Sequence, residues 1–408
     1  MEFASSKLDN GLTIVTEVNP AARSMAAGFF VKTGSRDETP DVAGVSHFLE
    51  HMVFKGTDRR SAFDVNLDFD RLGAHYNAFT SEENTVFYGW VLPEHQTRLL
   101  DLLCDILRPA LREEDFSVEK NVILDEIARY EDQPRFRVYD KLMAAHFAGH
   151  PLGNSILGAK ESIAALNRQQ MKEYFDRRYS PGNITVVGVG NLDRQVFVDK
   201  VSELCGDWSS FQTSRQTPLP RPDGARRIIH DPKVLREHMA LMSGAPPHQS
   251  ADRFAAELLA AIVGDDAGSR LFYALIEPGI ADEASMSYAP MDQAGGWMTF
   301  ISTDADKAAE AIGIAAKVLD DFARTGPQER ELQAAKNKIA SEATLRGELP
   351  MGRLSAVGFD WIYCGEYMPL SKQIEALFAV SREDVHQLAR KHDLPRATLV
   401  ALGPADQL

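Results

Sequence analysis

The chain has 408 residues, of which 44% are hydrophobic and 25% are charged, a balance that is ordinary for a folded globular protein. This length predicts two or three domains, each large enough for its own core. The formal charge of −15 argues against nucleic acid or an anionic membrane as the main partner.

The N-terminal segment MEFASSKLDNGLTIV has no basic stretch followed by an apolar one, so it predicts no signal peptide. No run approaches the roughly 18 apolar residues of a membrane-spanning helix. We therefore expect a cytoplasmic protein of bacterial type, although a leader that had been removed would leave no trace here. Three scattered cysteines without a CxxC pair predict small buried side chains in a reducing compartment, not a disulfide framework: Cys104, Cys205 and Cys364.

Strands and long helices alternate along the chain. Segments 11–18, 24–34 and 84–92 are rich in β-branched and aromatic residues between turn formers, which predicts strands. The apolar spacing predicts helices at 45–55, 93–107, 113–132 and 168–178. This mixture indicates an α/β or α+β architecture.

A linker and an internal repeat divide the chain. Residues 206–225, GDWSSFQTSRQTPLPRPDGA, lose all periodicity, which predicts domains at 1–208 and 226–408 joined by a linker at 209–225. YFDRRYSPGNITVVGVGNL (174–192) resembles LARKHDLPRATLVALGPAD (388–406). Asn183 matches Arg396, an offset of 213 (396 − 183). We interpret this as a duplicated domain.

The stretch GVSHFLEHMVFKGT (44–57) is the strongest candidate site. In a helix, His47 and His51 lie on one face a turn apart and can converge on one zinc ion. Glu50 lies beside them, where it can take a proton from an attacking water, in the order H-x-x-E-H. The alternative is an ordinary amphipathic helix. The apolar neighbours favour burial and therefore the metal.

The offset of 213 tests this interpretation. It carries the three polar positions onto apolar residues of the second copy: Ala260, Val263 and Gly264. If the triad were needed to hold the helix together, the second copy should have kept something like it. The first copy therefore carries the chemistry and the second only the scaffold.

A third zinc ligand is expected in DFSVEKNVILDEIARYEDQP (115–134). Glu119 and Glu126 are two helical turns apart and share a face. Either could bind the metal while the other supports the site, and the alternative is two glutamates on a solvated helix.

These segments resemble the pitrilysin or insulinase metallopeptidases, and most closely the processing-peptidase β-subunits and their bacterial relatives. In that family the third ligand stands where Glu126 stands, 74 residues beyond His51 (126 − 51 − 1), and Glu119 matches an additional supporting glutamate. The resemblance implies Zn²⁺ as cofactor. It also implies two homologous domains, each a mainly antiparallel sheet with helices packed on one face.

The segment GAHYNAFTSEENTVFYGWV (73–91) resembles the family's substrate-binding edge strand. The resemblance implies that an extended peptide adds to this strand at Asn77 and Ala78, with Thr80 nearby. By itself the pattern is that of an ordinary alternating strand with Phe79 in the core.

One segment departs from the family pattern. In LIEPGIADEASMSY (275–288), Ile276 and Asp282 stand where the family has an Arg and a Tyr that steady the oxyanion, and Tyr288 comes later. We therefore expect a second homologous subunit that supplies these donors, or a homodimer. The prediction is a zinc endopeptidase that hydrolyses peptides or unfolded segments inside a two-bowl chamber. The alternatives are a non-catalytic scaffold subunit and a dedicated maturation protease.

Overall fold

The computed structural model describes residues 1–216, 218–222 and 224–408, which form two compact units. The first comprises Met1–Ala128, Asn154–Gln216 and Thr344–Met368, and the second comprises Arg129–Gly153, residues 217–343 and Pro369–Leu408. Each unit thus includes a segment from the other half of the chain. The linear division at 209–225 stays a prediction, and residues 217 and 223 of that linker lie outside the described residues.

The first unit is built on a six-stranded sheet in the order β1-β2-β6-β3-β5-β4. Its pairs are antiparallel except β2 with β6. β3 and β6 are buried along their whole length, because layers on both faces exclude water and favour continuous apolar runs. The strands are β1 (Glu2–Lys7), β2 (Thr13–Val18), β3 (Met25–Val31), β4 (His75–Thr80), β5 (Thr85–Val91) and β6 (Ile184–Gly190).

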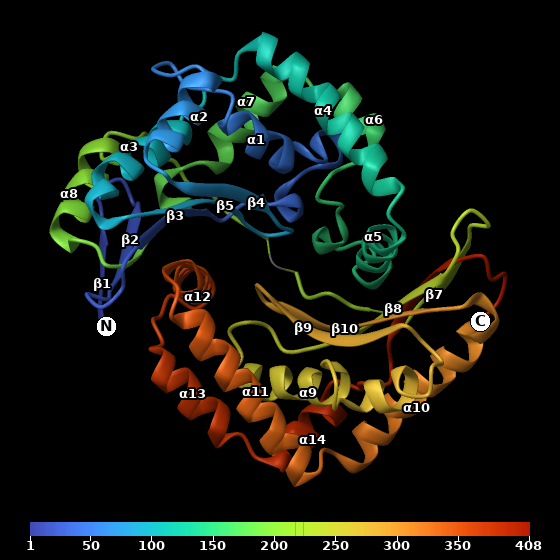
Figure 1. The fold of residues 1–408 in the computed structure, drawn as a ribbon. Coiled ribbons are helices and arrows are strands. Elements are labelled where there is room, and N and C mark those ends of the chain that lie inside the picture. Colours follow the sequence, from blue (N-terminus) through green and yellow to red (C-terminus); the bar gives the residue numbers. More distant parts are fainter. Residues whose placement is uncertain (217, 223) are drawn as a thin grey trace. The chain divides into compact units, whose positions relative to one another are not determined.

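Helices cover this sheet unequally. Most belong to the layer that packs on one face: α1 (Val45–Val53), α2 (Ala62–Arg71), α3 (Gln96–Ile106), α4 (Glu113–Glu131), α6 (Lys160–Ala165), α7 (Arg168–Arg178) and α8 (Arg194–Cys205). The opposite face carries α12 (Pro350–Cys364), which comes from the C-terminal half of the chain (Figure 1). Leu354 and Val357 of α12 pack there against Val15 and Phe30.

The second unit repeats this plan around a five-stranded sheet in the order β7-β11-β8-β10-β9. The strands are β7 (Arg226–His230), β8 (Glu237–Gly244), β9 (Glu283–Met291), β10 (Ala294–Thr303) and β11 (Thr398–Gly403). The helices are α9 (Arg253–Gly264), α10 (Ala308–Thr325), α11 (Glu329–Gly347), α13 (Leu370–Ala379) and α14 (Arg382–Lys391). α5 (Pro134–His146), from the N-terminal half, covers the other face, where Val138 and Leu142 pack against Met242 and Phe300.

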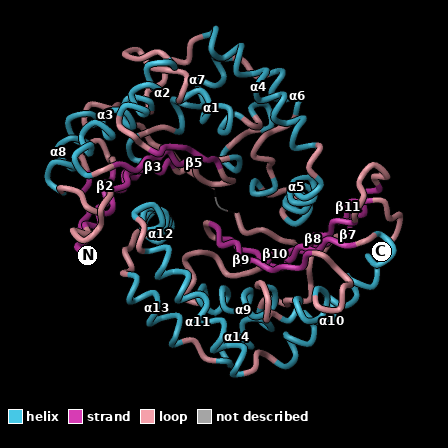
Figure 2. The backbone as a smooth tube through the Cα atoms, in the orientation of Figure 1, coloured by secondary structure: helices cyan, strands magenta, loops and turns pink. Residues whose placement is uncertain are grey.

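Apart from β1, which has no counterpart in the second sheet, the two strand orders are the same once the repeat offset is applied. Adding 213 places β2 on β7, β6 on β11, β3 on β8, β5 on β10 and β4 on β9, each within a few residues. The same shift places α5 on α12, the two helices that pack on the opposite face of each sheet. Figure 2 shows each sheet as a magenta layer with helices on both sides. The prediction of two homologous, mainly antiparallel domains with a helical layer on one face is confirmed, with one addition: a single helix, α12 or α5, also packs on the other face of each sheet.

Two further features concern the part of the chain that the structure describes. No helix there has the length and low charge that a membrane-spanning helix requires. All three cysteines are free, and the Sγ atoms of Cys104 and Cys205 lie 3.4 Å apart in the interior.

Candidate metal centre

The helix α1 carries two faces with different chemistry. Phe48, Leu49, Met52 and Val53 are buried and anchor its apolar side. The imidazoles of His47 and His51 lie one turn apart with ring centroids 4.7 Å from each other. Burial anchors the helix on one side, so both rings are presented together on the other.

Helix α4 brings a carboxylate to these rings. Oε2 of Glu126 lies 3.9 Å from Nε2 of His47 and 3.5 Å from Nε2 of His51. The three residues offer ligand atoms that all lie within 4.8 Å of one another. Zinc binds imidazole and carboxylate at about 2.0–2.2 Å, so an ion fits between atoms at these separations. Two imidazoles and one carboxylate are also a donor set used by catalytic zinc sites.

The pKa values of the two histidines are shifted in opposite directions. Burial, together with the charge of His51, lowers the pKa of His47 to about 3, so its imidazole is neutral, as metal binding requires. Burial also acts to lower the pKa of His51. The hydrogen bond to Glu119 and the charges of Glu126, Glu119 and Glu50 outweigh it and raise that pKa. The raised pKa favours the protonated imidazole of His51, the form that cannot bind a metal.

Glu119 contacts His51 from the same helix as Glu126. Its Oε1 lies 2.8 Å from Nδ1 of His51, and its Oε2 lies 2.6 Å from Nζ of Lys55. The contact at Nδ1 leaves Nε2 of His51 facing Glu126, which is how a supporting carboxylate orients a ligand imidazole. Of the two glutamates that the sequence left as alternatives, Glu126 belongs to the ligand group and Glu119 lies behind it. The sequence reasoning missed Lys55, although it lies one turn beyond His51.

Glu50 lies half-buried beside this group. Burial raises its pKa, and the hydrogen bond from Thr80 and the charge of His51 oppose that rise. The hydroxyl of Thr80 donates to Oε2 of Glu50 at 2.6 Å. Thr80, expected near a substrate, thus has its side chain on Glu50, a contact that no local pattern in the sequence could indicate.

The expected substrate strand β4 is the last strand of its sheet and pairs only with β5. Asn77 is exposed and lies opposite Tyr88, while Ala78 is 8% exposed and lies opposite Phe87. The Ala78 amide donates to Oδ1 of Asn77 at 2.9 Å. Phe79 is partly buried and packs against the cluster that includes Leu354.

The expected carbonyl-stabilising positions lie in the second unit, and each side chain there is engaged. Ile276 ends a π-helical turn (Phe272–Ile276) and packs on the core of that unit. Asp282 forms an ion pair with Arg236. The hydroxyl of Tyr288 donates to the carbonyl of Pro246 at 2.8 Å.

Comparison with known proteins places the chain in a family. The model described as Insulinase (Peptidase family M16) matches residues 13–160, and the model described as Peptidase M16 inactive domain matches residues 165–339. The uncharacterized zinc protease YmxG of Bacillus subtilis is 31% identical over 402 residues, 98% of each chain. An uncharacterized zinc protease of Rickettsia felis is 30% identical over 409 residues, 99% of this chain and 98% of its own.

Solved structures agree on the fold. A protease from Helicobacter pylori superposes with a TM-score of 0.91 at 20% sequence identity, with 99% of each chain covered. The chain therefore belongs to the insulinase family, peptidase family M16. The resemblance to the pitrilysin or insulinase metallopeptidases is confirmed.

Proposed function

We propose that this protein is a zinc-dependent endopeptidase of the inverted H-x-x-E-H type. The observation that carries the proposal is the convergence of His47, His51 and Glu126, with the carboxylate of Glu50 on the same helix as the two histidines. The relatives named zinc proteases support the same metal.

The chemistry follows from the positions of these groups. When bound by His47, His51 and Glu126, zinc supplies a Lewis acid that polarises a peptide carbonyl and acidifies water. Glu50 is the general base: it takes the proton of the attacking water and passes it to the leaving amine. The hydroxyl of Thr80 holds that carboxylate in place, and Glu119 holds the ring of His51.

The substrate is a peptide or an unfolded segment. We propose that it adds as an extended strand to the free edge of β4, at Asn77 and Ala78, where main-chain hydrogen bonds hold it whatever its sequence. The Ala78 amide would then exchange its bond to Asn77 for one to the peptide. A closed two-bowl chamber would exclude folded proteins.

A second subunit completes the site in this proposal. Because Ile276 cannot donate a hydrogen bond and Asp282 is already paired, we propose that a homologous partner chain supplies the Arg and Tyr donors. Losing one such donor lowers the rate by ~10²–10³. Full turnover by the isolated monomeric chain would rule out the need for a partner chain. Turnover by a homodimer would mean that a second copy of this chain takes the place of the proposed partner.

The test of the metal and base is Glu50→Gln. The variant should keep about one zinc per chain in elemental analysis, and its hydrolysis of a quenched fluorescent peptide should fall ~10²–10⁴-fold, the usual contribution of a general base. Glu131→Gln, at the exposed end of α4, is the matched control and should retain wild-type turnover. A Glu50→Gln enzyme that cleaves at the wild-type rate would refute the assignment of the base.

One alternative function has a specific observation behind it. The match of residues 165–339 to an inactive-domain model is also what a non-catalytic scaffold subunit of this fold would show. Zinc binding without hydrolysis of any peptide, with or without a partner, would favour that alternative.

A cytoplasmic location remains part of the proposal, and cell fractionation tests it.

A further inference from the structure

The N-cap residue of α1, the helix that carries His47 and His51, has no side chain that can cap the helix. Gly44 occupies the N-cap position of α1 with φ of 90°, in the left-handed region that favours glycine. A Cβ there would lie 2.6 Å from the carbonyl oxygen of Leu157 and 2.7 Å from Cδ1 of Ile163. No side chain can therefore stand at Gly44 to accept from the amides of the first turn, which have no partners within the helix.

Glu38, six residues earlier, does this instead. Its Oε2 accepts from the amide of Gly44 at 2.6 Å, and its Oε1 accepts from the amide of Ser46 at 2.7 Å. The side chain lies in the interior, with the residue 7% exposed. Burial raises the pKa of Glu38 to about 8, against the lowering effect of these two amides. The carboxyl is thus held out of water at the helix start.

A second contact secures the same turn. The hydroxyl of Ser46 lies 2.7 Å from the hydroxyl of Tyr174 on α7, which lies 2.7 Å from Oγ1 of Thr33. Ser46 and Thr33 are completely buried and Tyr174 is 1% exposed. Glu38 therefore holds the first turn of α1 through backbone amides, and Tyr174 holds it through the side chain of Ser46.

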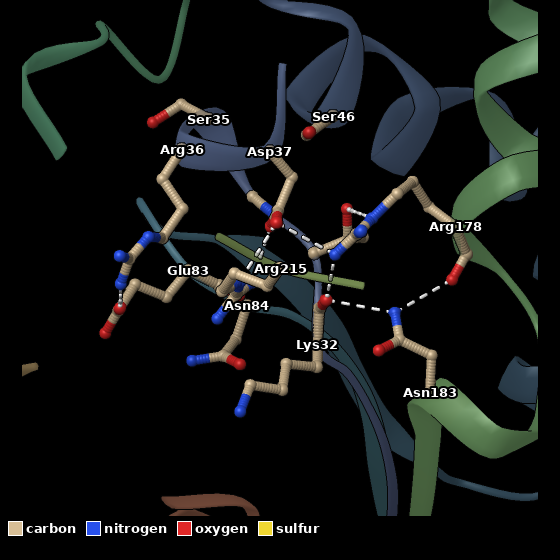
Figure 3. A network of polar contacts seen from close by, with 12 residues as sticks. Lys32, Ser35, Arg36, Asp37, Ser46, Glu83, Asn84, Arg178, Asn183 and Arg215 are labelled. Carbon is tan, nitrogen blue, oxygen red and sulfur yellow. Dashed lines mark hydrogen bonds and ion pairs between the residues drawn. The ribbon is translucent and has the colours of Figure 1, made fainter. Parts of the chain in front are cut away.

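The segment that carries Glu38 is itself anchored. Oδ1 of the preceding residue, Asp37, lies 2.8 Å from Nη2 of Arg178 and accepts from Nε of Arg215 at 2.9 Å (Figure 3). Arg36 forms a buried ion pair with Glu83. These ion pairs restrain the backbone next to Glu38. The carboxyl group of Glu38 therefore contacts α1 from a segment with little freedom to move.

We infer that Glu38 is a positioning residue for the metal centre: by binding the amides of Gly44 and Ser46 it sets where α1 begins and how it is rotated. His47 follows Ser46 directly, and α1 has only nine residues, too few to hold its geometry without tertiary contacts. A shift of the first turn would move Nε2 of His47 relative to Glu126. The inference rests on the proposed zinc site.

The experiment compares Glu38→Gln with Glu17→Gln in the full chain. Glu17 is another buried carboxylate of the same unit, 1% exposed, and it accepts hydrogen bonds from Arg353 and Tyr367 on the face covered by α12. Zinc affinity is measured by competition with a chromophoric chelator, and ligand geometry by the visible spectrum of the Co²⁺-loaded protein. Melting temperature reports the general loss of stability.

Glu38→Gln should weaken zinc binding about tenfold, the lower end for groups that act through a ligand, and alter the Co²⁺ spectrum. Glu17→Gln should lower the melting temperature but keep wild-type zinc affinity and spectrum. Unchanged zinc affinity in Glu38→Gln, or an equal loss in Glu17→Gln, would overturn the inference. If Glu38→Gln does not fold, Glu38→Asp, which withdraws the carboxylate by one methylene, is judged by the same readouts. A wild-type chain that binds no zinc would remove the proposed function and this inference with it.

Discussion

The two units share the order of five strands, but the equivalent helices α1 and α9 differ in their surroundings: polar groups face α1, and a tightly packed strand faces α9. In α1, His47 and His51 face the carboxylates of α4. In α9, the positions that match His47, Glu50 and His51 are all buried: Ala260, Val263 and Gly264. A Cβ on Gly264 would lie 2.3 Å from the backbone nitrogen of Met286. In the second copy the sheet thus lies against the helix at the position that corresponds to His51 in the first copy.

This difference shows what the duplicated scaffold requires. The sheet order and the helix on its far face persist in both units without the polar triad. The triad is therefore not part of what holds the fold together, and burying it beside α4 costs stability that the hydrogen bonds of His51 to Glu119 and of Thr80 to Glu50 offset in part. Three changes, taken from the largest expected effect to the smallest, test this contrast.

The largest effect is expected from His51→Ala, at the position that corresponds to Gly264. Removing a ligand should weaken zinc binding by more than the roughly 10–100-fold that the loss of a supporting group costs. Zinc affinity by chelator competition measures this. The control is His95→Ala, in the turn that precedes α3, which should bind zinc as the wild type does. Zinc retention by the His51 variant would mean that the metal lies elsewhere.

A smaller effect is expected where the two units should behave alike. Leu354→Ala on α12 and Leu142→Ala on α5 each remove a fully buried side chain from the far face of a sheet. Each should lower the free energy of unfolding in urea by about 2–5 kcal/mol. Leu345→Ala, 62% exposed on α11, is the control and should change it little. A negligible loss at Leu354 or Leu142 would show that this sheet does not depend on the helix from the other half of the chain.

The smallest effect is expected from Gly264→Ala. The added methyl group meets the backbone at Met286, so we expect a loss of about 1–3 kcal/mol in the free energy of unfolding, with zinc content unchanged. Gly313→Ala in α10 is the matched control. Apart from its chain neighbours and the adjacent backbone of α10, no described heavy atom lies within 4 Å of its added Cβ, and the change should be neutral or stabilising by ~0.5–1 kcal/mol. Equal behaviour of the two variants would contradict the tight closure of the second unit.

Much of the local structure could be predicted from the sequence. The segment expected as a helix at 45–55 is α1 (Val45–Val53), and the one at 113–132 is α4 (Glu113–Glu131). The pairing of His47 with His51 needed only the spacing of one helical turn. The repeat offset also anticipated a duplicated domain, because apolar periodicity is preserved when two copies diverge; the strand orders themselves came from the structure.

What joins distant segments was decided by the tertiary structure. Helical spacing alone left Glu119 and Glu126 as candidates, and the family resemblance favoured Glu126. Only the path of α4 past α1 places Glu126 at both Nε2 atoms and Glu119 at Nδ1 of His51. The sequence also could not indicate that α5 packs in the second unit and α12 in the first, or that Thr80 contacts Glu50. Residues a few positions apart have their geometry set by the local backbone, whereas contacts between distant residues depend on how the whole chain packs.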